Sequence, residues 1–174
     1  MKYEVLLVGE LHPWTKLDYE GYQILGERSP WRKDKVPKLT IDYETYLLEK
    51  WKPDRLFMEV RTKERDKSIL KCIRDNRLNC QRFYFPTPSH DESEFKKIQS
   101  ELRKLYDESV VEEMLCEDSE FMRKLYEADL LKKLEDNILA SSRTMALIGI
   151  AHLQPAYYTM REKKELNVYA LAIA

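Results

Sequence analysis

The chain lacks several features that would assign it quickly to a protein class. Its three cysteines, Cys72, Cys80 and Cys116, form no CxxC pair, and an odd number of thiols cannot all pair within one chain. This pattern favours a reducing compartment over a disulfide scaffold. No apolar run approaches the ~20 residues needed to span a bilayer, and no charged-then-apolar leader precedes Tyr3. We therefore expect a cytoplasmic protein that does not enter the membrane.

The chain also lacks an excess of charge of one sign. Its 30 Lys and Arg residues nearly balance its 31 Asp and Glu residues. No strong electrostatic field is therefore present to recruit nucleic acid or an anionic membrane. The length of 174 residues suits one domain, 1–174, with a substantial hydrophobic core.

Glycine is scarce, and two of the four glycines stand three residues before two of the three histidines. The pairs are Gly9 with His12 and Gly149 with His152, and each lies at the end of an apolar run. Chance placement would give roughly 0.07 such pairs in the chain. An apolar run that stops at glycine indicates a buried strand turning into a loop. Because ligands of open parallel sheets bind beyond the carboxyl ends of the strands, the two histidines are predicted to share one sheet edge.

Apolar patterning predicts strands that alternate with helices. The predicted strands are Lys2–Val8, Arg55–Val60, Gln81–Phe85, Thr144–Ile150 and Asn167–Ile173. Helical spacing appears over Ile41–Trp51 and Lys63–Leu78, in a helical middle segment (90–140), and in a short helix from Pro155. This alternation predicts an α/β domain with a mostly parallel sheet of about five strands flanked by helices.

Residues 13–40 show no clear periodicity, and an ordered excursion of this length is uncommon unless it binds a ligand or forms a lid. The aromatic residues of this segment are Trp14, Tyr19, Tyr22 and Trp31. They either pack against the helices or close over the site to exclude water.

Polar side chains follow four of the five predicted strands, and they form the candidate site. Glu10 and His12 follow the first strand, Glu59 interrupts the apolar second strand, and His152 follows the fourth. An unpaired buried carboxylate at Glu59 would cost several kcal/mol, so we expect a cation, a metal or an imidazole beside it. We assign Glu10, His12, Glu59 and His152 as catalytic, with Glu10 as general base.

Two imidazoles and a carboxylate make a first shell for Zn²⁺, Mn²⁺ or Fe²⁺ with a position open to water. His12, Glu59 and His152 are therefore the candidate ligands of a divalent metal, which would lower the pKa of bound water and polarise a carbonyl. The spacing lacks the tight local pattern of HExxH or paired CxxC motifs. His90 and Asp91, after the third strand, and Tyr157, after His152, are additional candidates.

Each candidate site residue, taken alone, also has a structural explanation. A histidine after a strand is often a hydrogen-bonded structural residue, and Glu10 could cap a helix. Glu59 could pair with Arg55 or Arg61, and His90 could cap the following helix. Tyr157 and its neighbour Tyr158 either bind a substrate oxygen or are buried. The joint placement of His12, Glu59 and His152 is what favours a site.

The motifs resemble those of the TraB/Tiki, ChaN-like and erythromycin-esterase-like superfamily. The residues that carry the resemblance are Gly9-Glu10-Leu11-His12, the acid closing Phe57-Met58-Glu59, and Gly149-Ile150-Ala151-His152. The resemblance implies an α/β fold with a helical middle and a hydrolytic site built from Glu10, His12, Glu59 and His152. Pro13 and Trp14 stand where ChaN-like proteins often carry further histidines, so we do not expect haem.

The leading hypothesis is a hydrolase of ester, lactone or peptide bonds, metal-assisted, acting on a small-molecule or peptide substrate. The alternatives are a non-catalytic module that binds a metal or haem at the same edge, and an interaction protein with a degenerate site.

Overall fold

A five-stranded parallel sheet, with the strand order β3-β2-β4-β1-β5, is the centre of the fold. The computed structural model describes residues 3–10, 38–59, 63–85, 92–115, 119–140 and 142–173. The strands are β1 (Tyr3–Glu10), β2 (Arg55–Met58), β3 (Gln81–Tyr84), β4 (Arg143–Gly149) and β5 (Leu166–Ile173). The predicted α/β class with a parallel sheet of about five strands is confirmed.

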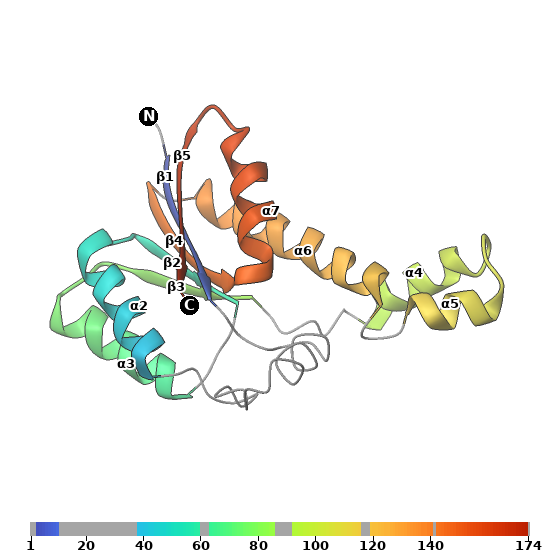
Figure 1. The fold of residues 1–174 in the computed structure, drawn as a ribbon, viewed down its shortest axis with the longest axis horizontal. Helices are drawn as coiled ribbons and strands as arrows, with labels where there is room; N and C mark the ends of the chain where they lie inside the picture. Colours follow the sequence, from blue (N-terminus) through green and yellow to red (C-terminus); the bar gives the residue numbers. More distant parts are fainter. Residues whose placement is uncertain are drawn as a thin grey trace, which may run out of the picture. The chain divides into compact units, whose positions relative to one another are not determined.

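Three helices in the connections between strands cover the two faces of the sheet. They are α2 (Lys38–Trp51), α3 (Lys63–Asp75) and α7 (Ile150–Arg161). In Figure 1, α2 and α3 lie on one side of the sheet and α7 lies on the other. Crossover helices on both faces bury a parallel sheet from both sides, which explains the nearly continuous apolar sequence of β1 and β4.

The core follows from the alternation of side chains along the strands. Successive residues of a strand point to opposite faces, so residues two apart share a face. Leu6 and Val8 of β1 pack with Leu48 of α2 and Ile69 of α3. The same cluster contains Leu56, Met58, Met145 and Leu147. By this alternation, Glu10 belongs to the face covered by α2 and α3, whereas Gly9 belongs to the face covered by α7.

Contacts divide the chain into two compact units, Met1–Phe85 with Lys133–Ala174, and Pro86–Lys132. The second unit holds α4 (Glu92–Leu102), α5 (Glu108–Met114) and most of α6 (Glu120–Ile138). It overlaps the predicted helical segment 90–140. Ser119 caps α6, because its Oγ accepts a hydrogen bond from the Met122 N–H at 3.1 Å.

The boundaries of two predicted elements differ from the structure. β1 continues through Gly9 to Glu10, so Gly9 lies inside the strand and does not open a loop. The last helix begins at Ile150 and contains Pro155 in its interior, so the prediction of a helix starting at Pro155 is wrong. His152 therefore lies in the first turn of α7. Within the described ranges, no helix combines the length and the apolar character that a membrane span requires.

Candidate functional site

The carboxyl ends of β1, β2 and β4 meet at one edge of the sheet and bring three of the predicted residues together. Glu10 is the last residue of β1 and pairs in register with Gly149, the last residue of β4. Glu59 directly follows β2, and its N–H donates to the Leu147 carbonyl at 2.9 Å. His152 begins the helix that follows β4. Three segments far apart in sequence thus meet at this edge: the end of β1, the end of β2, and the junction of β4 with α7.

Glu59 and His152 form the first pair of this site. Glu59 Oε2 accepts a hydrogen bond from the Gly149 N–H at 2.5 Å, and Glu59 Oε1 lies 3.5 Å from His152 Nε2. The Glu59 side chain is 7% exposed and that of His152 is 19% exposed. Gly149 is the N-cap of α7, so the carboxylate lies at the helix N-terminus, where the helix dipole stabilises negative charge. The buried acid therefore has the imidazole partner that its sequence position predicts.

Glu10 belongs to a second cluster on the other face of the sheet. Arg65, near the start of α3, donates from Nη2 to Glu10 Oε1 and from Nε to Glu44 Oε2 of α2, the latter at 2.8 Å. The exposed fractions of Glu10, Glu44 and Arg65 are 2%, 1% and 0%. A fully buried guanidinium is tolerated only when it is paired in this way. Glu10 thus has a guanidinium for a partner; the residues that follow it, where a helix for it to cap would begin, lie outside the described ranges.

Burial changes the protonation of this cluster. Burial raises the pKa of Glu10 well above its usual value; Arg65 opposes this shift, while Glu44, by its charge and by a hydrogen bond, and the charge of Glu59 add to it. Burial also raises the pKa of Glu44, although Arg65 and the hydrogen bond with Glu10 lower it in part. Burial acts to lower the pKa of Arg65, but the two carboxyl groups outweigh it and the pKa is raised.

The charges of the three side chains balance when one carboxyl group keeps its proton. Two carboxylates around one guanidinium would leave a net negative charge in a buried place, which is costly. Burial raises the pKa of both acids, so the two carboxyl groups together keep one proton. These contacts favour a supporting role for Glu10 over the role of general base that the sequence predicts.

Arg65 and Glu44 are the members of the site that the sequence analysis missed. A signal for both was present. Arg65 stands four residues before Ile69, and Glu44 lies three residues after Ile41 and four before Leu48, so both occupy the apolar stripe of their helix. A charged residue on such a stripe must find a buried partner.

Of the other predicted site residues, Tyr157 is the one that the structure describes. His12, His90 and Asp91 are outside the described residues, as are residues 13–37 of the predicted lid. Tyr157 is half-buried on α7, five residues after His152. Its ring packs edge-on against Tyr158 at 5.8 Å between centroids, and the Arg161 guanidinium lies 5.8 Å from it.

The described part of the site supplies two groups that fit a metal ion. Ligands of one tetrahedral zinc ion, with bonds of about 2.0–2.2 Å, lie roughly 3.4 Å apart. The 3.5 Å between Glu59 Oε1 and His152 Nε2 matches this separation. Among the described residues, no group of three or more His, Cys, Asp or Glu side chains could hold a metal. A third ligand would have to come from outside them, and His12 is the residue that the sequence predicts for it.

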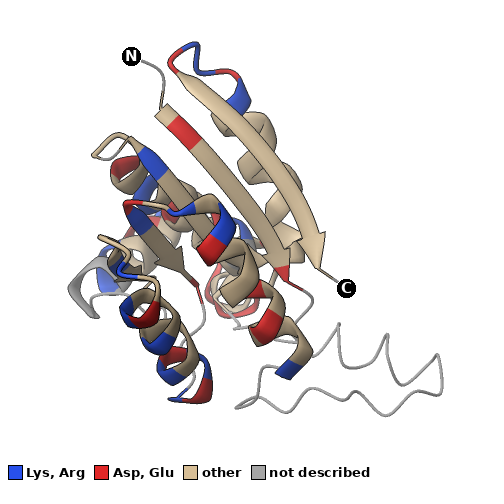
Figure 2. Cartoon of the chain, turned by 90° about the vertical axis from the view of Figure 1, so that its left-hand side faces the viewer, with Lys and Arg blue, Asp and Glu red and all other residues tan. Residues whose placement is uncertain are grey.

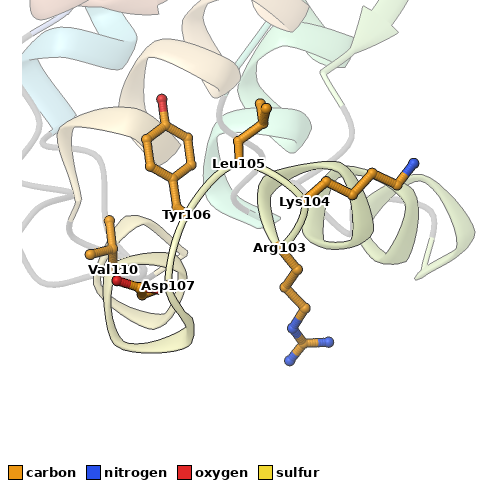
Figure 3. Close-up of a pocket in the computed structure, with 6 residues that line it drawn as sticks. All are labelled: Arg103, Lys104, Leu105, Tyr106, Asp107 and Val110. Carbon is orange, nitrogen blue, oxygen red and sulfur yellow. The ribbon is translucent and has the colours of Figure 1, made fainter.

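The second unit contains a hollow of about 400 Å³ that is separate from these residues. It is lined by Arg103, Lys104, Leu105, Tyr106, Asp107 and Val110, in and after the turn between α4 and α5. Figure 3 shows the labelled side chains pointing in different directions from the ribbon. Arg103 is occupied by a salt bridge to Glu108 at 2.5 Å. The hollow therefore lacks the converging polar groups of a catalytic site.

Comparisons with protein-family models, with curated proteins and with solved structures gave no match for this chain. The functional interpretation consequently depends on the residues themselves.

Proposed function

We propose that the chain is a hydrolase of ester, lactone or peptide bonds, with its reaction centre at Glu59 and His152. The observation that carries this proposal is the contact of a buried carboxylate and an imidazole at the carboxyl edge of a parallel sheet. Ligands of such sheets bind at this edge. The resemblance of the Gly-x-x-His motifs to the TraB/Tiki, ChaN-like and erythromycin-esterase-like superfamily supports the same reaction class.

In this proposal the two side chains activate water together. The His152 imidazole takes a proton from water, which then attacks the substrate carbonyl, and the same proton passes to the leaving alkoxide or amine. Glu59 orients the imidazole and stabilises its protonated form, while Gly149 holds Glu59 in place through its N–H. Arg65, Glu44 and Glu10 stiffen the adjoining strand end from the opposite face of the sheet.

A divalent metal, Zn²⁺, Mn²⁺ or Fe²⁺, is the alternative way of activating water in this proposal, in which the side chains are ligands and His152 is not the base. His12, Glu59 and His152 would hold it, and when bound it would lower the pKa of a bound water and polarise the substrate carbonyl. The separation of Glu59 Oε1 and His152 Nε2 supports this assignment. Haem is not proposed, because Pro13 and Trp14 follow the first motif.

We also propose a cytoplasmic location and a small-molecule or peptide substrate. Cys72 and Cys80 are half-buried free thiols, which supports a reducing compartment. The near balance of charge gives no reason to expect a nucleic-acid substrate.

Turnover of a panel of esters, lactones and peptides by the purified chain tests the proposal. Glu59→Gln and His152→Ala should each lower kcat/KM by about 10²–10⁴-fold, because each removes a group that moves or stabilises the transferred proton. Glu162→Gln, an exposed acid at the C-terminal end of the same helix, is the matched control and should leave the rate unchanged.

The readouts separate catalysis from binding. Circular dichroism should show that both variants keep the fold, and elemental analysis of chelator-free protein should show metal that His152→Ala loses. Full activity in both Glu59→Gln and His152→Ala would overturn the proposal. Stoichiometric metal without turnover of any substrate would instead indicate the non-catalytic binding module.

A further inference from the structure

β5 is an edge strand with an open side. It pairs with β1 over all eight of its residues, from Leu166 opposite Tyr3 to Ile173 opposite Glu10. None of the other strands in the described ranges pairs with its outer side. Figure 2 shows β5 at the margin of the sheet with no Lys, Arg, Asp or Glu along its length. An edge strand of this kind presents a row of unpaired N–H and C=O groups to another strand.

β5 lacks the features that usually protect an edge. Proteins protect such edges with charged side chains, proline, bulges or very short strands. The opposite edge strand, β3, has only four residues and carries Arg82. β5 has twice that length, with the sequence LNVYALAI, and its register to β1 contains no bulge. The two edges of the described sheet are therefore built differently, and β5 is the longer edge and the one without charge.

Apolar side chains adjoin this edge on the α2 side. Tyr169 pairs in register with Leu6, so it shares the face that α2 and α3 cover, and its ring packs edge-on against Trp51 of α2 at 5.4 Å between centroids. Tyr169 is nevertheless 48% exposed. Along the same helix, an exposed stripe with the spacing i, i+4, i+7 consists of Leu39, Tyr43 and Tyr46. The absence of charge is thus a property of the strand edge itself, because on α2 the Lys50 Nζ lies 5.6 Å from the Tyr46 ring centroid.

We propose that β5 pairs antiparallel with β5 of a second copy of this chain, about a twofold axis, and so joins two five-stranded sheets. The outer edge offers main-chain groups, so its natural complement is a strand. A twofold interface brings each residue near its own symmetry mate, which demands a self-compatible surface. A strand without charge meets this demand, because no like charges face each other across the axis. A charged partner would find no complementary group on it.

The solution mass of the full chain, measured by light scattering after size exclusion over a concentration series, tests the proposal. The wild type should be a dimer. Ala170→Lys should halve the mass, because Ala170 is exposed on β5 and lysine there places like charges beside the axis. Ala172→Lys is a second exposed edge variant with the same expected result. Leu70→Lys, on an exposed position of α3, is the matched control and should stay dimeric.

Hydrogen exchange of individual amides tests whether β5 itself forms the interface. Alternate amides of β5 do not bond to β1 and face the open edge. These amides should be protected in the wild type and should exchange rapidly in Ala170→Lys, while the amides of β1 stay protected in both. The proposal is overturned by a monomeric wild type at every concentration, by an unlimited rise of mass, or by dimers that survive both edge lysines.

Discussion

Glu10 is a carboxyl group enclosed by protein on the side of the sheet that α2 and α3 cover. One guanidinium, that of Arg65, serves both Glu10 and Glu44, so the three side chains form a neutral group only while one acid keeps its proton. A group of this kind contributes little net free energy when complete, yet removing one member leaves an unpaired buried charge. The cluster of Glu10, Glu44 and Arg65 fixes the end of β1 near Glu59 and His152.

The stability of the fold should depend on pH through Glu10. Its pKa is raised in the folded state, chiefly by burial, so the folded chain holds this proton more tightly than the unfolded chain does. The contribution of Glu10 to the free energy of unfolding is therefore fully present below the ordinary carboxyl pKa and is lost as the pH rises through the folded value. Urea unfolding at several pH values from about 4.5 upward should show this decline.

Glu10→Gln isolates that contribution. Glutamine keeps the size and the neutral state of the protonated acid. The free energy of unfolding of the variant should therefore decline less with rising pH than that of the wild type, and the variant should become more stable relative to the wild type at alkaline pH. Glu162→Gln, which changes an exposed acid, should keep the wild-type pH dependence. Identical pH profiles for Glu10→Gln and the wild type would contradict a raised pKa of Glu10 in the folded chain.

Sequence patterns predicted individual site residues unevenly, and the reason is physical. Glu59 was predictable because a carboxylate inside an apolar strand requires a partner, and the structure supplies the Gly149 N–H and His152. Arg65 stands in the run Lys63-Glu64-Arg65-Asp66-Lys67, where charges usually face solvent. Only its position four residues before Ile69, on the buried face of the helix, distinguishes it from its neighbours. Its partners, Glu10 and Glu44, come from other elements, so no local pattern indicates them.

At the scale of elements, the packing of α7 on β1 sets the position of His152. The strand alternation places Gly9 on the α7 face, and a Cβ built on Gly9 would lie 2.7 Å from Leu153 Cδ2. Glycine is thus needed for close approach of the helix and not for a turn. The sequence pattern indicated that Gly9 matters, but it predicted a turn there. Close packing between segments that are distant in sequence leaves no local pattern from which it could be predicted.

The start of α7 was misplaced for a related reason. Proline is common at the first helical position, so Pro155 suggested a beginning there. In the structure it lies one turn and a half inside the helix, where its ring removes the bond to the Ala151 carbonyl. The helix nevertheless begins at Ile150, where Glu59 accepts the N–H of the N-cap residue Gly149.

Gly9→Ala should therefore disturb both the fold and the site. The added methyl group must displace Leu153, and overpacking of this kind costs typically about 1–3 kcal/mol. Because Leu153 directly follows His152, the variant should also lower the rate of the proposed hydrolysis. Urea denaturation and kcat/KM measure the two effects.

The double variant Gly9→Ala/Leu153→Ala provides the control for steric origin. Removing the Leu153 side chain makes room for the new methyl group, so Gly9→Ala should cost less in the Leu153→Ala background than in the wild type. An equal loss of unfolding free energy on Gly9→Ala in both backgrounds would show that the contact between Gly9 and Leu153 does not determine how closely α7 packs on β1.

At the scale of the whole molecule, the order of the strands places the first and the last strand of the chain side by side. β1 lies between β4 and β5, so the first strand is flanked by the last two. The sequence predicted a parallel sheet, because strands and helices alternate, and it predicted a shared edge for both motifs. It did not predict the order β3-β2-β4-β1-β5, because pairing between strands depends on contacts that a single chain's periodicity does not encode.

The inserted second unit leads to a prediction about folding. The sheet unit comes from Met1–Phe85 and Lys133–Ala174, and the ends of these two segments are close, since Lys133 Nζ lies 4.8 Å from the Phe85 ring centroid. The C-terminal turns of α6 keep Leu134 and Ile138 fully buried. Replacing the segment between the two ends with a short Gly/Ser linker should leave the sheet unit folded, with Ser at the linker end to cap the shortened helix.

Circular dichroism and urea unfolding of this shortened chain measure the outcome against the full chain. A single cooperative transition with helical and strand signal is expected, because all five strands belong to the sheet unit. The site residues Glu10, Glu59, Arg65 and His152 belong to it as well. The shorter connection also lowers the entropy cost of closing the loop, by about 1–2 kcal/mol. An unfolded product would show that residues 1–174 fold only as one cooperative domain. Retained hydrolysis in a folded product would place the whole reaction centre within the sheet unit.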